Sequence, residues 1–365
     1  MTEIHISDIR QFRQCRRAWD WGSRFRRNLE PAVPYPPFYT GRLIHSALEH
    51  YYRDGTPLLD TLTAELKGAA TNLWPQEVLT FDEQEALMHN ILLHYDMWIA
   101  LDKKMYSDAN LEFISLEREF RVPLPTPSGR RAKGLMLGGR FDGIVRHKGT
   151  GEYWIWETKT TRSIKELVSS LAHDEQCGVY MYAASKALGV PVVGVLYNII
   201  RKKAPTRPAV LKSGLLSKAV NVDTTAFFYL NCIREMYPDW TAETIAEFFG
   251  DTLGALVSNE SKFFMRYPVY RSTIEIKNLM RGIYYTAREM KRKSLYLYPS
   301  PGWLACTFCA FKSPCLTMNT GGDYEVLLRE EYQPREQFTL LEEEDDDSSN
   351  GTVVFSNVNR TNTPN

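Results

Sequence analysis

The middle of the chain changes from helical to strand-like patterning, and this change limits the possible folds more than any other feature. Runs rich in β-branched and aromatic residues, separated by glycine and proline, predict strands at 111–124, 135–147, 153–158, 192–200 and 263–270. Between the third and fourth runs, apolar residues at helical spacing predict helices at 164–171 and 175–188. Central strands with helices between and around them predict an α/β or α+β fold.

The flanking parts of the chain show helical patterning. Most of the segment 1–104 has apolar residues at helical spacing, and its first helix is predicted from the spacing of Ile9, Phe12, Cys15 and Trp19. Further helices are predicted at 224–236, 241–257 and 273–292. We therefore predict one domain over 1–329, composed of a helical N-terminal part (1–104), a sheet core (105–272) and a C-terminal helix with a cysteine-containing loop (273–320).

The net charge of zero is the sum of two unlike regions. The chain has 44 Lys and Arg against 44 Asp and Glu, but residues 330–365 hold nine acids and two bases, including six consecutive acids at 342–347. The remainder therefore has 42 bases and 35 acids, a net charge of +7. Such an acid run cannot bury apolar surface, so 330–365 is predicted to be a disordered tail. The body is basic enough to bind a polyanion.

Neither a secretory signal nor a membrane span is predicted. The first ten residues contain no apolar stretch of signal-peptide length, and no window approaches 18 uninterrupted apolar residues. We expect a soluble, cytoplasmic protein with no membrane partner. In a reducing compartment, six cysteines favour metal binding over a disulfide framework.

Two predicted strands bring acidic residues and a lysine together. The sequence Gly-Arg-Phe-Asp-Gly-Ile-Val occupies 139–145, and Trp-Ile-Trp-Glu-Thr-Lys-Thr occupies 154–160. Because side chains alternate along a strand, Glu157 and Lys159 point the same way, and a hairpin would place Asp142 beside Glu157. Two carboxylates suit a divalent cation, and the lysine can orient a water or neutralise charge on a phosphate. An ordinary amphipathic strand is the alternative interpretation.

Two pairs of residues on predicted helices accompany this hairpin. His45 and Glu49 lie one turn apart before it, and Gln176 and Tyr180 lie one turn apart after it. The order His, Asp, E-x-K, Q-x-x-x-Y resembles the PD-(D/E)XK nucleases of the RecB-like branch, which includes the RecB and AddB nuclease domains and the CRISPR-associated single-strand exonucleases. The resemblance runs from about residue 7 to 318. It implies a restriction-endonuclease-like core, a central mixed sheet flanked by helices, with a helical N-terminal insertion.

The resemblance also implies a role for individual residues. It implies that the ligands of an Mg²⁺ or Mn²⁺ ion are His45, Asp142, Glu157 and the Thr158 carbonyl. It makes Lys159 the catalytic lysine, acting with Asp142 and Glu157, and it gives Gln176 and Tyr180 the positioning of the DNA backbone. An imidazole ligand favours tolerance of Mn²⁺. Phe141 stands where the family has its name-giving proline, which is not a ligand.

Three cysteines share one loop near the end of the body. Cys306, Cys309 and Cys315 form C-x2-C-x5-C, which is one ligand short of four, and the fourth could be Cys15, Cys177 or Cys232. RecB-like nucleases with an iron–sulphur cluster have one cysteine upstream of the core and three downstream at this spacing. The resemblance therefore implies a [4Fe–4S] cluster on Cys15, Cys306, Cys309 and Cys315. A zinc ion on the same four thiolates is the alternative.

The first predicted helix is rich in arginine and tryptophan. Arg13, Arg16 and Arg17 lie close to Trp19 and Trp21. Basic side chains interleaved with aromatic rings suit single-stranded DNA, because the cations pair with phosphates and the rings stack on bases. We predict that these three arginines bind DNA. A solvated helix face is the alternative.

Together these features predict a metal-dependent DNA nuclease. Resemblance to the stand-alone members implies a single-strand-specific exonuclease that acts 5′-to-3′ in recombination, repair, or phage or CRISPR DNA processing, with a recombination or replication protein as a partner. The chain has no G-x-x-x-x-G-K-[ST] motif for an ATP-driven motor. The alternatives are an endonuclease of the same fold and a non-catalytic iron–sulphur DNA-binding adaptor subunit.

Overall fold

A computed structural model describes residues 2–24, 26–32, 36–70 and 75–335. Its central sheet has six strands: β1 (Thr2–His5), β3 (Leu111–Pro125), β4 (Arg131–His147), β5 (Tyr153–Thr161), β6 (Val192–Arg201) and β7 (Phe264–Tyr270). The order is β1-β4-β5-β6-β7, and β3 also pairs with β4. The β1–β4 and β5–β6 pairs are parallel and the other pairs are antiparallel. The sheet is therefore mixed, and the predicted fold class is confirmed.

Strands β4 and β5 form the hairpin that the sequence predicts. Gly143 pairs with Trp156 and Ile144 with Ile155. One step further along the two strands, Asp142 therefore lies level with Glu157. Strand β3 runs antiparallel to β4 along its other edge. Side chains from three adjacent strands can consequently meet at this point of the sheet.

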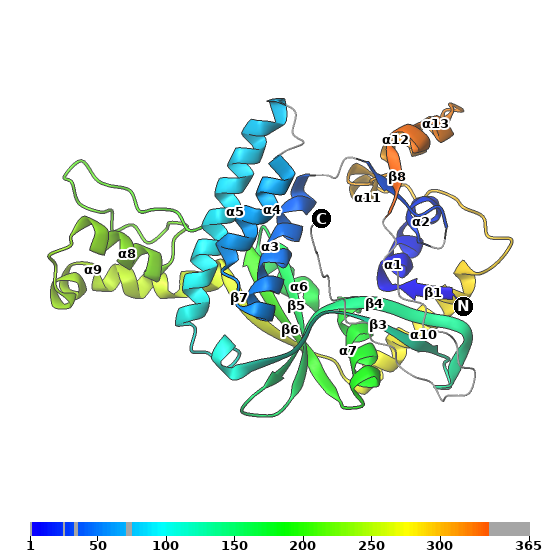
Figure 1. Cartoon of the computed structure of the whole chain (residues 1–365), viewed down its shortest axis with the longest axis horizontal. Helices are drawn as coiled ribbons and strands as arrows, with labels where there is room; N and C mark the ends of the chain where they lie inside the picture. Colours follow the sequence, from blue (N-terminus) through cyan, green and yellow to red (C-terminus); the bar gives the residue numbers. More distant parts are fainter. Residues whose placement is uncertain (1, 25, 33–35, 71–74, 336–365) are drawn as a thin grey trace, which may run out of the picture.

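Helices cover both faces of the sheet (Figure 1). One face is covered by α3 (Pro36–Asp54), α4 (Leu58–Ala70) and α5 (Pro75–Leu101), and the other by α6 (Ile164–Leu171), α7 (Glu175–Leu188) and α10 (Thr273–Met290). Alternate side chains of β5 enter the two cores. Trp154 and Trp156 lie in the cluster that Tyr52 of α3 packs against, whereas Ile155 lies in the cluster with α7 and α10.

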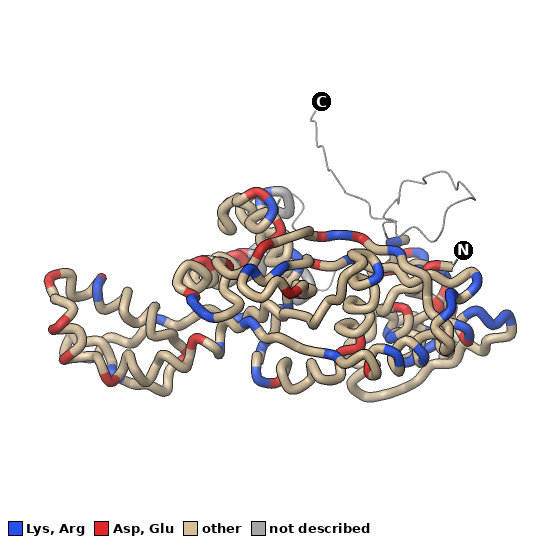
Figure 2. The backbone as a smooth tube through the Cα atoms, turned by 90° about the horizontal axis from the view of Figure 1, so that it is seen from below, with Lys and Arg blue, Asp and Glu red and all other residues tan. Residues whose placement is uncertain are grey.

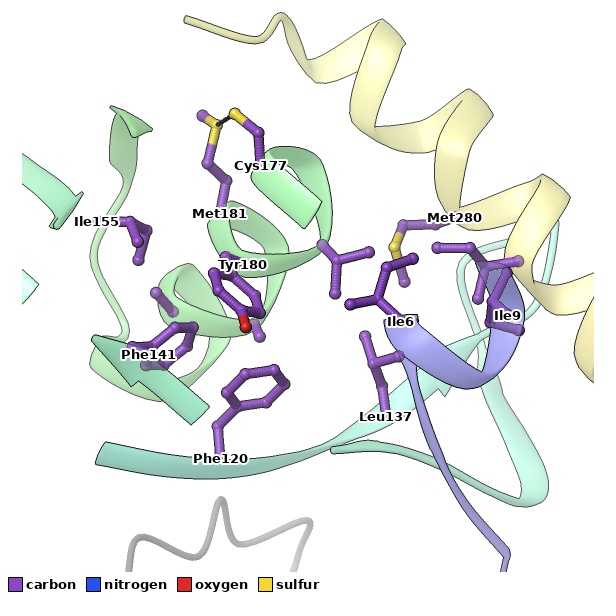
Figure 3. Close-up of a cluster of buried hydrophobic side chains, with 14 of the residues drawn as sticks. Ile6, Ile9, Phe120, Leu137, Phe141, Ile155, Cys177, Tyr180, Met181 and Met280 are labelled. Atoms are coloured by element: carbon purple, nitrogen blue, oxygen red, sulfur yellow. Dashed lines mark hydrogen bonds between the residues drawn. The ribbon is translucent and has the colours of Figure 1, made fainter. Parts of the chain in front are cut away.

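The core beneath α7 fixes the orientation of Tyr180. Figure 3 shows this tyrosine beside Phe120 and Phe141, with Ile6 and Met280 farther along the same cluster. The ring centroids are 4.5 Å apart for Phe120 and Phe141 and 5.3 Å apart for Phe141 and Tyr180, and the latter pair meets edge to face. Phe141, at the position of the family's proline, is fully buried. It therefore contributes packing that holds α7 against β4.

Helices α8 (Ala226–Met236) and α9 (Ala242–Leu256), near their predicted positions, form a separate lobe with its own apolar cluster, joined to β7 by η2 (Val257–Lys262). This lobe projects from the left end of the sheet in Figure 1. In Figure 2 the lobe is marked mostly by Asp and Glu, whereas Lys and Arg gather toward the opposite end of the molecule. None of the helices in the described part of the chain has the length and apolarity that a bilayer crossing requires.

The predicted helical N-terminal part, residues 1–104, differs from the structure in two respects. Residues Thr2–His5 form β1, a strand of the central sheet in which Ile4 is fully buried. The predicted first helix is two helices, α1 (Ile6–Gln14) and α2 (Arg16–Gly22), because Cys15 between them is extended at φ −160° and ψ 114°. The four residues of β1 are too few to show a strand period in the sequence. The break at Cys15 was missed because the helical spacing of apolar residues continues from α1 into α2.

The predicted start of the tail at residue 330 is also wrong. The remaining elements near the start and middle of the chain are β2 (Leu29–Pro31) and η1 (Asp108–Asn110). Those after α10 are α11 (Trp303–Thr307), α12 (Lys312–Asn319), α13 (Tyr324–Glu330) and β8 (Tyr332–Pro334). Strand β8 pairs with β2, and Tyr332 stacks on Phe311 with ring centroids 5.2 Å apart. A truncation meant to remove only the acidic tail must therefore end at Arg335. The predicted disorder from residue 336 onward lies outside the described residues.

Candidate active site

His45, Asp142 and Thr158 meet where α3 lies against the central strands of the sheet. His45 Nδ1 lies 3.4 Å from Asp142 Oδ2, and the Thr158 N–H donates to the same carboxylate oxygen at 2.8 Å. A hydrogen bond also joins the His45 ring to the Thr158 backbone. The structure thus brings together three of the four groups that were predicted as metal ligands, including the backbone of Thr158.

Glu157, the fourth predicted ligand, belongs to a hydrogen-bonded chain that runs to α7. Lys159 Nζ donates to Glu157 Oε1 at 2.6 Å and to Gln176 Oε1 at 3.2 Å. The Gln176 amide donates to Glu157 Oε1 at 3.1 Å and to the Tyr180 hydroxyl at 2.8 Å. The chain holds Lys159 at a fixed position beside Glu157. Gln176 thus links Tyr180 to Glu157, and the role of the two residues in positioning DNA stays a prediction.

The second oxygen of Glu157 is unsatisfied. Glu157 is 4% exposed, and its Oε2 is buried without a hydrogen-bond partner among the described residues. An unpartnered buried carboxylate oxygen is costly, and a divalent cation is the partner that a set of carboxylates and an imidazole accepts. The residues present therefore fit an Mg²⁺ or Mn²⁺ ion.

The structure adds Glu117, which the sequence analysis did not identify. Its carboxylate, the Asp142 carboxylate and the His45 ring nitrogen all lie within 4.8 Å of one another. Leu116 pairs with Gly143 and Arg118 with Phe141, so Glu117 on β3 lies opposite Asp142. Its φ of +46° departs from strand geometry. No sequence motif marks this glutamate, because only the β3–β4 register places it at the site.

Burial dominates the electrostatics of the three carboxyl groups. Burial raises the pKa of Asp142, and it raises the pKa of Glu117 to about 8. Burial also raises the pKa of Glu157 to about 7, and the nearby Asp142 charge adds to this rise. Burial also lowers the pKa of His45. For Lys159, burial opposes the charge, but the attraction of Glu157 outweighs it and raises the pKa. The site thus resists ionising all its carboxyls unless a cation is present.

Two hollows flank the hydrogen-bonded chain. One, of about 350 Å³, is lined by Asp142 and Tyr180 together with Gly138 and Arg24. The other, of about 420 Å³, is lined by Lys159 and by residues of α6. Arg10 and Gln176 line both hollows. A polymer that occupies both would pass the carboxylates and the lysine in succession.

The three arginines predicted to bind DNA have partners within the fold. Arg13 pairs with Glu175 of α7 at 2.6 Å, and Arg16 pairs with Glu289 of α10. Arg17 donates to Asn319 at 2.7 Å. These contacts join α1 and α2 to elements far along the chain. A role of these arginines in DNA binding stays a prediction.

Four cysteines line one cavity between α2, α11 and α12. The cavity has a volume of about 680 Å³ and is lined by Cys15, Cys306, Cys309 and Cys315. Arg17 donates to Cys315 Sγ at 3.3 Å, and the Gly302 N–H donates to Cys306 Sγ at 3.4 Å. Cys177 and Cys232, the other candidates for a fourth ligand, are buried elsewhere, in α7 and α8. The extended backbone at Cys15 therefore occurs where that residue joins the other three.

The spacing of these sulfurs bears on what the cavity can hold. In the described part of the chain, no three cysteine sulfurs lie within 4.8 Å of one another. A tetrahedral zinc ion with Zn–S bonds of about 2.3 Å holds its sulfurs roughly 3.8 Å apart. A four-iron cluster is larger and keeps its thiolates farther apart. Four thiols that line one cavity suit a metal centre, and which centre they hold stays a prediction.

We expect Glu117→Gln to weaken metal binding. The change removes one negative charge from a site that includes His45 and Asp142, and it leaves Arg140 without the carboxylate that it contacts at 2.8 Å. The Mn²⁺ concentration for half-maximal binding should rise roughly 10- to 100-fold, as measured by titration calorimetry. Glu112→Gln, on the same strand but paired with Arg146, is the matched control. Equal affinities for the two variants would exclude Glu117 from the site.

The raised carboxyl pKa values predict a pH-dependent response to Mn²⁺. The metal-free folded protein keeps protons on Glu157 and Glu117 that the unfolded chain releases near the ordinary pKa of 4.5. Its stability should therefore fall as the pH rises from about 5 to 8. Mn²⁺ displaces these protons, so the rise in Tm with Mn²⁺ should be larger at about pH 8 than at about pH 6. Equal rises at both pH values would contradict this coupling.

Comparison with known proteins agrees with this arrangement. A family model described as the PD-(D/E)XK nuclease superfamily matches residues 4–316. The match includes the hairpin, the hydrogen-bonded chain on α7 and all four cavity cysteines. No curated protein matches the sequence.

Proposed function

Since the chain belongs to the PD-(D/E)XK nuclease superfamily, we propose that it is a metal-dependent DNA exonuclease that hydrolyses phosphodiester bonds of single strands or DNA ends. The observation that carries this proposal is the convergence of His45, Asp142 and Glu117 within 4.8 Å, beside the Lys159–Glu157 pair. The resemblance to the stand-alone exonucleases is the basis for three finer parts of the proposal. These are specificity for single strands, 5′-to-3′ polarity, and a role in recombination, repair, or phage or CRISPR DNA processing.

We assign the metal to His45, Asp142, Glu157 and the Thr158 carbonyl, with Glu117 opposite Asp142. A bound Mg²⁺ or Mn²⁺ supplies Lewis acidity and lowers the pKa of a coordinated water. The Thr158 N–H fixes one Asp142 oxygen, and the unpartnered Glu157 Oε2 is free to serve as a ligand. The protein's own contribution is thus a rigid set of donors that is arranged before the substrate arrives.

Lys159 acts as a cation rather than as a base. Its pKa is raised, since the attraction of Glu157 outweighs burial, so the ammonium stays charged at neutral pH. Gln176 holds the same ammonium from the other side. A fixed positive charge beside the metal ligands can orient the attacking water and offset the charge that develops on the phosphate.

We also propose that the four cavity cysteines hold a [4Fe–4S] cluster. Support comes from the cavity that all four cysteines line and from the Arg17 and Gly302 donors to sulfur. The cluster would join α2 to α11 and α12 across a chain loop of about 290 residues. Its role here is structural: it ties the N-terminal segment to the C-terminal one.

The function is tested with end-labelled linear and circular single-stranded DNA in Mn²⁺. The wild-type protein should degrade the linear DNA progressively and leave the circle intact, and Lys159→Ala should cut roughly 10²- to 10³-fold more slowly. Lys165→Ala, an exposed lysine on α6, should match the wild type. Opening of the circle would indicate an endonuclease. Binding without cleavage would indicate the adaptor subunit, and equal rates for Lys159→Ala and wild type would remove the lysine from the mechanism.

A further inference from the structure

The outer face of α10 carries a row of exposed basic and aromatic side chains. The inner face of this helix is buried through Met280, Ile283, Ala287 and Met290. The exposed row consists of Lys277, Arg281, Tyr285 and Arg288. At 3.6 residues per turn these four positions fall within an arc of roughly 80° and extend over roughly 16 Å of helix. We call these four residues the α10 stripe.

The cations of the α10 stripe are not engaged by acids. None of its three basic residues forms an ion pair with any described residue. The nearby acids of the helix are occupied, since Glu275 accepts from the Ser272 N–H and Glu289 pairs with Arg16. Arg13 and Arg16 of the first helices, by contrast, are both paired with carboxylates. Unpaired cations are thus concentrated on α10 rather than on α1 and α2.

Basic and aromatic character continues beyond the end of α10. Lys291, Arg292 and Lys293 are exposed, and they are followed by Tyr296 and Trp303, which are 79% and 84% exposed. The segment between these two rings is anchored to α2, because the Arg17 N–H donates to the Tyr298 carbonyl at 3.2 Å and the Arg16 guanidinium lies 4.8 Å from the Tyr298 ring centroid. Large rings so exposed on an anchored segment are available to stack on a partner.

We propose that the α10 stripe, with Tyr296 and Trp303, binds single-stranded nucleic acid outside the active site. Phosphates would pair with the cations, and unpaired bases would stack on the rings. Exposed rings favour a single strand over a duplex, because duplex bases are already stacked on one another. The inference rests on the proposed nuclease function and adds a second contact region for the same substrate.

The packing of α10 places the stripe on an element adjacent to the active site. A Cβ built on Gly178 would lie only 2.5 Å from Leu279 Cδ2, so α7 and α10 are in close contact there. Gln176 of the hydrogen-bonded chain lies two residues before Gly178, and Leu279 lies two residues after Lys277. Arg13 spans the same helices, since it contacts both Glu175 and Thr286. A long substrate can therefore contact both regions, whereas a very short one contacts the active site alone.

The test compares labelled oligo(dT) of about 6 and about 30 nucleotides, bound without divalent metal. The variant is Lys277→Ala/Arg281→Ala/Arg288→Ala, and the matched control is Lys103→Ala/Lys212→Ala/Lys262→Ala, three exposed lysines that lie outside α10 and the segment after it. The stripe variant should bind the 30-mer on the order of tenfold more weakly than the wild-type protein does. The fall of log K with log salt concentration should also be less steep in this variant, by roughly 2 units of slope. The 6-mer should bind equally well.

A double variant of the two exposed rings separates the contribution of stacking from that of charge. Tyr296→Ala/Trp303→Ala should weaken 30-mer binding on the order of tenfold without changing the salt slope. The proposal is overturned if the control variant loses as much affinity as the stripe variant, or if binding of the 6-mer falls as much as binding of the 30-mer. It is also overturned if duplex DNA or an acidic peptide binds the stripe as tightly as the 30-mer does. Cleavage of the 6-mer in Mn²⁺ should be unchanged in the stripe variant. Absence of that cleavage in the wild type would count against the nuclease proposal alone.

Discussion

Asp142→Asn is expected to lower kcat/KM on single-stranded DNA on the order of 10³-fold, which corresponds to about 4 kcal/mol of lost transition-state stabilisation. Asp142 lies between His45 and Glu117, so its charge is central to metal binding. The fold should survive, because the amide oxygen of asparagine can still accept the hydrogen bond that the Thr158 N–H donates to Oδ2. Initial cleavage rates and Mn²⁺ titration calorimetry measure the two effects separately.

An exposed carboxylate provides the control for this change. Asp251→Asn on α9 removes the same charge far from the site and should cut at the wild-type rate. Asp142→Asn/Glu157→Gln should lose little more activity than Asp142→Asn, because both carboxylates are assigned to one ion and residues that act as a unit are not additive. Near-wild-type cleavage by Asp142→Asn would place the metal elsewhere.

Cys309→Ser is expected to abolish iron binding and lower Tm on the order of 10 °C. If the cluster closes a chain loop of about 290 residues, its loss releases roughly 5 to 6 kcal/mol of unfolded-chain entropy on the scale of a cross-link. Cys309 also packs against the small core that holds Trp21 and Phe311. Iron content after anaerobic purification and the thermal unfolding midpoint are the measurements.

The buried cysteine of α8 separates cluster loss from the general effect of a cysteine substitution. Cys232→Ala truncates a fully buried side chain in the α8–α9 lobe and should leave the iron content unchanged. A wild-type protein that contains one zinc and no iron would refute the cluster.

The elements predicted best from the sequence are those with strong local periodicity. Helices α6 and α7 begin and end at the predicted residues, because capping by Ser163 and Asp174 limits their N-terminal ends locally. The register between Asp142 and Glu157 followed from strand alternation and a short turn, which are also local properties. Local patterning was therefore sufficient for the hairpin that carries the E-x-K sequence.

The elements missed depend on partners distant in sequence. Strand β1 is stabilised by pairing with β4, more than 120 residues later, and β8 by pairing with β2. Glu117 enters the site only through the irregular register of β3 on β4. The arginines predicted to bind DNA were chosen because they are interleaved with aromatic residues, and that pattern cannot distinguish a free guanidinium from one that pairs with a carboxylate, as Arg13 does with Glu175.

The β2–β8 pairing has a consequence for biosynthesis. Leu29 pairs with Pro334, so β2 waits for a strand that is made about 300 residues later. At about 5 to 20 residues per second this delay is roughly 15 to 60 s. During that interval Trp21, which the finished protein buries against Phe311 and Tyr324, has neither partner. The apolar side of α2 therefore stays exposed in the nascent chain until α12 and α13 have been synthesised.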